Sequence, residues 1–158
     1  MSNYDDLFSA PRRALTIATS AYRVKASFRL FHEDLDPEQI TEQFGFSPTY
    51  YHRKGDRRSG KSGRVYSPYT KGAWILSSEG KIRSLNANEH IRFVLGELAH
   101  RISVIHRLQH EGYDADIVCA WFAESDNTCP TLTAETISEL ARFRVNCWFD
   151  VYLFPPEE

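Results

Sequence analysis

The sequence predicts an α+β domain of ferredoxin-like type, in which helices pack on one face of a mostly antiparallel sheet. Apolar and polar residues alternate in several short segments, as they do in half-buried strands. Apolar residues three and four positions apart mark a long helix between these segments, and two further helix starts each follow a strand. Strand and helix signals therefore both occur along the chain, which is why the sequence predicts the α+β class.

The composition is that of one globular domain. Of the 158 residues, 42% are hydrophobic and 25% are charged, which suffices for a single core. The net charge of -2 is too small to indicate a nucleic-acid or membrane partner. Three cysteines at irregular spacing fit neither a disulfide framework nor a zinc site. Neither a membrane span nor a signal peptide is evident, so we expect a cytoplasmic protein. We also expect that the protein has no cofactor.

The first helix and strand have clear boundaries. Residues 1–21 show no sustained period and are predicted to form an N-terminal arm, which leaves 22–158 as the single α+β domain. Alternation over Tyr22–Leu30 predicts a strand. Asp36 follows as a helix N-cap, and Gly45 ends this short helix.

One long loop and one long helix divide the rest of the chain. Residues 47–72 are rich in Ser, Pro, Gly, Tyr and basic side chains, which predicts a loop with a hairpin edge near Arg64–Tyr66. Residues 88–111 predict one continuous helix, and Thr133 is the N-cap of a last one. Three further segments have strand patterns: Gly72–Ser77, Asp114–Phe122 and Asn146–Phe154. In Asp114–Phe122 apolar residues point to both sides, so we expect both faces of this strand to be covered.

The two helix starts share a pattern. Leu35–Ile40 and Leu132–Ile137 each place the same hydrophobic staple and cap after a strand. Two explanations are open: the chain contains duplicated strand-helix units, or good helix starts simply look alike.

Enzyme-type motifs are weak. Gly55–Ser62 matches the phosphate-loop pattern, in which Lys61 would reach a phosphate, but that chemistry needs a strand before the loop and a helix after it. The flanking residues predict neither, so we interpret the match as accidental and the protein as no enzyme. His106 and His110 lie on one helix face but lack a third ligand, so no metal site is predicted.

Residues 53–64 are predicted to form a basic loop. It holds six basic residues against one acidic residue, a net charge of +5. Tyrosines, including Tyr66, lie close by on both sides of it, and Arg57 and Arg58 lie at its centre. Such a loop can bind RNA through charge and stacking, dock on an acidic protein patch, or simply be solvated.

Acidic residues gather after two of the strands. Glu33 and Asp34 follow the first, and Glu124 and Asp126 follow a later one. If the strand-helix units are related, both loops lie at one end of the sheet and form an acidic edge that steers a cationic partner. The alternative is that these are ordinary loop residues. No spacing holds the carboxylates together as a magnesium site does.

In order and spacing, several motifs resemble a bacterial domain-of-unknown-function family, number forty-two seventy-nine. The motifs are Ala26–Arg29, Leu35–Ile40, Gly45–Thr49, Lys54–Asp56, Trp74–Ser77, Glu89–His90, Leu132–Glu135 and Phe149–Tyr152. The resemblance implies a small cytosolic protein of a kind often encoded near polymorphic toxins, and with it an immunity role.

The expected function is therefore that of a non-enzymatic immunity protein, an antitoxin that docks on a cognate toxin domain and occludes its active site. An ADP-ribosyltransferase and a nuclease both fit as the toxin. We expect contacts from the acidic edge and the basic loop, through Glu33, Asp34, Glu124, Asp126, Arg57, Arg58 and Tyr66. Nucleic acid is not the expected partner, and the alternative is an RNA- or nucleotide-binding regulator that uses the basic loop.

Overall fold

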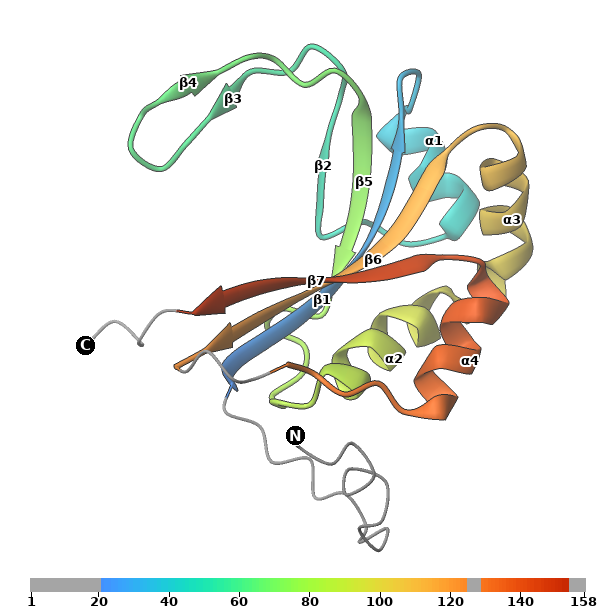
Figure 1. Ribbon diagram of the computed structural model, residues 1–158. Coiled ribbons are helices and arrows are strands. Elements are labelled where there is room, and N and C mark those ends of the chain that lie inside the picture. The colour runs from blue at the N-terminus through green and yellow to red at the C-terminus, as the bar shows by residue number, and fades with distance from the viewer. Residues whose placement is uncertain (1–20, 125–128, 154–158) are drawn as a thin grey trace, which may run out of the picture.

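The computed structural model describes residues 21–124 and 129–153, which form a five-stranded sheet, four helices and a small two-stranded hairpin (Figure 1). The predicted α+β class, with a mostly antiparallel sheet and helices on one side, is confirmed. The predicted N-terminal arm, apart from Ala21, lies outside the described residues, as does Asp126.

The sheet has the strand order β2-β5-β1-β6-β7. Neighbouring strands are antiparallel, except that β7 runs parallel to β6. The first four of these strands, with the helices between them, have the βαββαβ order of a ferredoxin-like unit. Helix α4 and strand β7 extend that unit at one edge. The strands are β1 (Ala21–His32), β2 (Tyr50–His52), β5 (Gly72–Ser77), β6 (Asp114–Ala123) and β7 (Asn146–Leu153).

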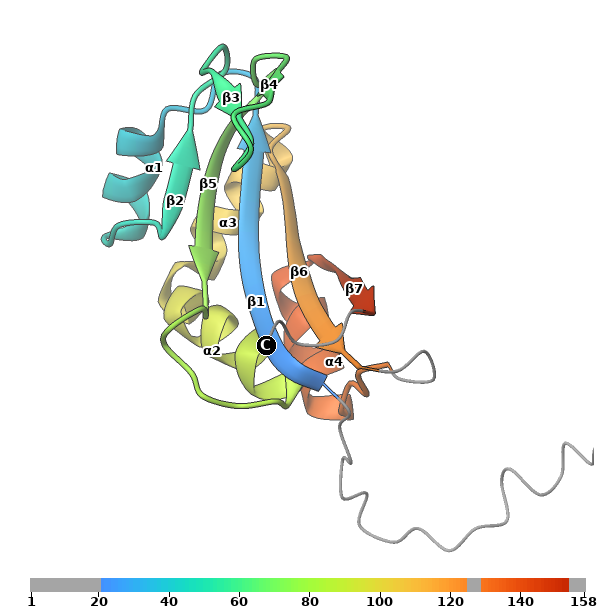
Figure 2. The ribbon, with the colours of Figure 1, turned by 90° about the vertical axis from the view of Figure 1, so that its left-hand side faces the viewer.

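All four helices pack on the same side of the sheet (Figure 1). They are α1 (Pro37–Phe44), α2 (Ala87–Leu98), α3 (Ile102–His110) and α4 (Ala134–Phe143). Figure 2 looks onto the other side, the open sheet face, where no helix of the described residues lies. A hairpin of β3 (Arg58–Ser59) and β4 (Val65–Tyr66) stands over one end of this face. No helix in the described part is long and apolar enough to cross a membrane.

The core lies between the sheet and the helices. Alternate residues of β1, among them Phe28, are buried against the helix side. Phe44 of α1 and Trp74 of β5 meet edge to face, with ring centroids 4.7 Å apart, and Phe28 lies 6.3 and 6.5 Å from them. Such edge-to-face aromatic contacts add to the stabilisation that comes from burial alone.

The local helix signals are confirmed. The Asp36 carboxylate accepts a hydrogen bond from the Glu38 backbone N–H at 3.1 Å, and the Thr133 hydroxyl accepts one from the Thr136 N–H at 3.3 Å. Gly45 ends α1 with φ +85°, a conformation that costs a residue with a Cβ atom more than it costs glycine.

The prediction of one continuous helix over 88–111 is wrong. A 3₁₀ turn at Ala99–Arg101 separates α2 from α3, and the two helices run in different directions (Figure 1). Helix α2 buries Ile91 and Leu98, whereas α3 buries Ile105 and Leu108. The break lets each helix turn its apolar stripe onto its own part of the twisted sheet, which one straight helix does not do.

Two further expectations need correction. Residues 50–52 fall in the predicted loop but form β2, an edge strand paired with β5. The prediction that both faces of β6 are covered is wrong: Ile117 and Cys119 are buried against the helices, while Val118 and Phe122 lie on the open sheet face and stay partly exposed.

Candidate functional site

An ion pair lies at the centre of the open sheet face. Arg29 of β1 donates from Nε and Nη2 to the two carboxylate oxygens of Asp116 on β6, both at 2.8 Å. Trp148 of β7 donates its Nε1–H to the same carboxylate at 3.2 Å. The Arg29 guanidinium also lies 5.0 Å from the Trp148 ring centroid and 5.3 Å from that of Phe31. This cluster holds in place a tryptophan that is 54% exposed.

A second aromatic group continues along β6 and β7. The rings of Phe122 and Tyr152 are stacked, with centroids 4.6 Å apart, and the Arg23 guanidinium lies 5.2 Å from the Phe122 centroid. The Tyr152 hydroxyl donates to Asp150 at 2.5 Å, and this hydrogen bond raises the pKa of Tyr152. The open sheet face thus presents aromatic rings whose positions are fixed by charged neighbours.

A cleft of about 410 Å³ lies between the open sheet face and the base of the hairpin. His52 of β2 is stacked on Tyr69, with ring centroids 3.5 Å apart, and the Tyr50 and Tyr69 hydroxyls are 3.4 Å apart. The Arg58 guanidinium lies 5.6 Å from the Tyr69 centroid. His52 is buried, its Nδ1 has no hydrogen-bond partner, and burial lowers its pKa.

The structure divides the basic loop into two parts. At its base, Arg53 pairs with Glu38 and Lys54 pairs with Glu33. The Lys54 ammonium lowers the pKa of Glu33 and is itself held charged. The four remaining basic residues form no ion pair with any described residue: Arg57, Arg58, Lys61 and Arg64. The free positive charge is therefore concentrated on the hairpin, where Arg58 and Arg64 each lie 5.3 Å from the Tyr66 ring centroid.

The segment that matches the phosphate-loop pattern forms part of this hairpin. Strand β3 lies inside the motif, and Gly63 and strand β4 follow Ser62. A phosphate loop instead opens directly into a helix, whose N-terminal N–H groups hold the phosphate. The residues of the motif are thus present, but their local structure is a hairpin and not a phosphate loop.

The predicted acidic edge does not form. Strands β1 and β6 are antiparallel, with Ala21 opposite Ala123 and Phe31 opposite Asp114. Glu33 and Asp34 therefore follow β1 at one end of the sheet, whereas Glu124 follows β6 at the other. Asp126 lies outside the described residues. The expectation failed because it required both strands to run in the same direction.

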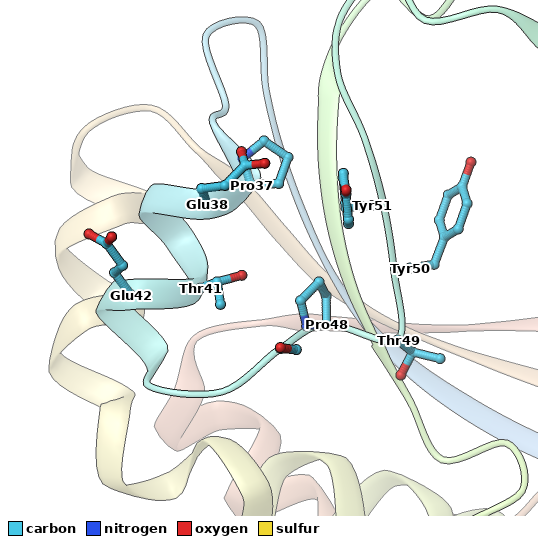
Figure 3. A pocket seen from close by; sticks show the side chains of 9 residues that line it. Pro37, Glu38, Thr41, Glu42, Pro48, Thr49, Tyr50 and Tyr51 are labelled. Carbon is cyan, nitrogen blue, oxygen red and sulfur yellow. The ribbon is translucent and has the colours of Figure 1, made fainter.

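A groove of about 550 Å³ lies between α1 and the edge strand β2 (Figure 3). Pro37 and Pro48 form part of its wall, and Tyr51 lies between the strand and the helix. Glu38 at its rim is already paired with Arg53, and Glu42 points away from β2 in this view. The groove thus offers a small apolar surface and no unpaired charge directed into it that would select a ligand.

The thiols and histidines are not grouped with other described side chains in a metal-binding arrangement. Burial raises the pKa of Cys119 to about 12 and that of Cys147 to about 11, so both thiols are protonated at neutral pH. His106 Nε2 lies 3.0 Å from the Arg142 carbonyl oxygen. Within 21–124 and 129–153, no three side chains are grouped as metal ligands.

Sequence reasoning singled out Arg57, Arg58 and Tyr66, of which the hairpin brings Arg58 and Tyr66 together, but it missed the cluster of Arg29, Asp116 and Trp148. The alternation along each strand indicates on which face of its own strand each of these three residues lies. Their meeting depends on the pairing register, in which Arg29 lies opposite Asp116 and Val118 opposite Trp148. No local signal in the sequence carries that register.

The fold and this surface define a ferredoxin-like α+β domain whose open sheet face carries clustered arginine and aromatic side chains. The chain belongs to the family described as Domain of unknown function (DUF4279), whose model matches residues 20–154. No curated protein and no solved structure matches the chain.

Proposed function

We propose that this protein is an immunity protein, which binds a cognate bacterial toxin domain through its open sheet face and hairpin and occludes the active site of that toxin. The observation that carries the proposal is the exposed Trp148 of the edge strand β7, which is held on the open sheet face by Arg29 and Asp116. Tryptophan, tyrosine and arginine are the residues that most often dominate protein-protein binding energy.

The charge pattern of the face favours a protein partner over a nucleic acid. Arg29 is paired with Asp116, Arg23 and Lys25 are paired with Glu79, and Asp150 lies on the same face. Nucleic-acid binding relies on cations that are free to neutralise phosphates. Paired charges beside fixed aromatic rings instead match the mixed chemistry of a protein interface.

The resemblance to proteins encoded near polymorphic toxins supports the immunity role in particular. Under this proposal the toxin is an ADP-ribosyltransferase or a nuclease. The docking surface differs from the one expected from the sequence, because Glu33 is paired with Lys54 and Glu124 lies at the opposite end of the sheet. The open sheet face and the hairpin take the place of the acidic edge.

The test is co-expression of the tagged protein with toxin domains encoded beside its gene, followed by pull-down, calorimetry and a toxin activity assay. We expect one stoichiometric complex with a Kd on the order of nanomolar and loss of toxin activity. Trp148→Ala should weaken binding about 30-fold or more, as loss of a central anchor does. Glu97→Ala, an exposed change on α2, is the matched control and should leave the affinity unchanged. Failure to capture any neighbouring gene product contradicts the proposal.

A second candidate is an RNA- or nucleotide-binding regulator. It is favoured by the four basic side chains of the hairpin that have no ion pair with a described residue, two of which, Arg58 and Arg64, lie beside Tyr66. Labelled single-stranded RNA should then bind at low salt and be released as salt rises. Absence of binding at low salt removes this candidate.

A further inference from the structure

Among the cations that line the cleft between the hairpin and the open sheet face, Arg58 differs from the others. Arg29 and Lys71 also line it, but they are paired with Asp116 and Asp114, the latter at 2.7 Å. Arg58 forms no ion pair with any described residue. One guanidinium without an ion-pair partner among the described residues therefore remains in the cleft.

The surroundings of Arg58 leave its hydrogen-bonding edge available. Its guanidinium lies 5.3 Å from the Tyr66 ring centroid and 5.6 Å from the Tyr69 centroid. Contact with aromatic rings uses the flat face of a guanidinium, while its N–H groups lie in the plane and can donate to two oxygens at once. A planar carboxylate fits this edge in the bidentate manner.

The Tyr69 ring does not offer a nucleobase a free face. A base binds to an aromatic side chain by stacking on a free ring face. Here His52 already covers Tyr69 at 3.5 Å, with an interplanar angle of 14°, and Arg58 also lies within 6 Å of that ring. Besides Tyr50, the lining includes the apolar side chains of Phe31 and Ile75, which suit an aliphatic side chain beside the carboxylate.

We propose that this cleft binds an acidic segment of the protein partner, with the Arg58 guanidinium holding a carboxylate side chain and Phe31 and Ile75 contacting an apolar neighbour. The inference rests on the proposed function, because the segment belongs to the protein that docks on the open sheet face. If the toxin is a metal-dependent nuclease, whose site is rich in carboxylates, an inhibitor that holds one of them would occlude that site.

The first experiment uses a defined probe. ¹⁵N-labelled protein is titrated with an acetylated and amidated leucine-glutamate-leucine peptide, and the matched control replaces glutamate by glutamine. We expect saturable chemical-shift changes at the residues that line the cleft, with affinity at least about tenfold higher for the glutamate peptide. Equal binding of both peptides, or no saturable change, overturns the inference.

Two arginine variants separate a specific site from general positive charge. Arg58→Gln should lower the affinity for the glutamate peptide about tenfold or more, whereas Arg57→Gln, on the neighbouring unpaired arginine, should change it less than about twofold. Both proteins should keep the unfolding midpoint of the wild type, because both side chains are exposed. Equal losses in the two variants overturn the inference, as does uridine monophosphate shifting the same residues with higher affinity than the peptide.

The same variants distinguish this inference from the proposed function. If a toxin domain is captured and Arg58→Gln weakens the complex, both stand. If the domain is captured and Arg58→Gln leaves the affinity unchanged, the cleft is not its docking site and only the proposed function stands. Saturable peptide binding without capture of any toxin domain retains the carboxylate site and rejects the immunity role.

Discussion

His52 combines burial with an unpartnered ring nitrogen. Its Nδ1 is buried without a hydrogen bond, and its ring is stacked on Tyr69. Leaving a polar atom in this condition costs about 1–3 kcal/mol. Burial lowers the pKa of the side chain below its ordinary value of 6.5, and the nearby Asp56 opposes this only in part.

This pKa shift makes stability depend on pH. As the pH falls through 6.5 the unfolded chain binds a proton at His52 that the folded chain does not, so the free energy of unfolding decreases. Above about pH 7 both states are neutral and the effect disappears. His52→Phe retains a ring on Tyr69 and removes the proton, so the variant should gain stability relative to the wild type between about pH 7 and pH 5. Urea unfolding across that range measures this, and parallel pH profiles would contradict it.

Asp116 is the acceptor for both Arg29 and Trp148. The side chains of this ion pair are only 23% and 24% exposed, so its loss leaves a partly desolvated guanidinium without a counter-charge. Asp116→Asn should lower the free energy of unfolding by about 1–3 kcal/mol.

The exposed pair of Lys71 and Asp114 provides the matched control. Its side chains are 47% and 69% exposed, so water screens the interaction, and Asp114→Asn should cost clearly less stability than Asp116→Asn. Urea midpoints of the two variants give the comparison. Equal costs would show that the central pair does not have the structural role assigned to it.

At the scale of elements, the hairpin is separable from the fold. Every residue of β3 and β4 is exposed. The base of the hairpin is closed by backbone hydrogen bonds between Gly55 and Tyr69 at 2.8 Å and between Tyr69 and Asp56 at 3.2 Å. Because it buries little apolar surface, the hairpin contributes little to global stability.

Replacement of residues 57–67 by a short glycine-serine turn tests this separation. We expect the unfolding midpoint to change little, because no residue of the core is removed, and partner binding to be lost with Arg58 and Tyr66. Circular dichroism and calorimetry measure the two effects. Unfolding of the shortened chain would show that the hairpin is part of the folding unit.

At the scale of the whole molecule, one core joins all main elements. The cluster of buried residues includes Phe28 of β1, Phe44 of α1, Leu95 of α2, Ile105 of α3 and Phe143 of α4. No helix has a separate core within the described residues. A domain of this size with one core unfolds in a single cooperative step.

We therefore expect coincident unfolding transitions by two probes. Trp74 and Trp121 are buried, so their fluorescence reports tertiary packing, while far-ultraviolet circular dichroism reports the helices and strands. Both should give the same urea midpoint. Separate midpoints would show that α4 and β7, the extension of the ferredoxin-like unit, unfold independently of the rest.

The sequence by itself determined the features that depend on neighbours along the chain. The Asp36 and Thr133 caps, the αL glycine at Gly45 and the strand alternation of β1 each arise from contacts within a few residues. These signals were sufficient for the α+β class and for most strand and helix positions. They also located the basic hairpin, since its composition is local.

Tertiary structure alone decided what these elements form together. Arg29 and Asp116 are 87 residues apart in sequence, and they meet because β1 and β6 pair in one particular register. The antiparallel direction of the same pair separates the acidic loops, and pairing with β5 makes a strand of Tyr50–His52, which looked like loop. Pairing register and direction depend on packing across the whole sheet, so no window of neighbouring residues encodes them.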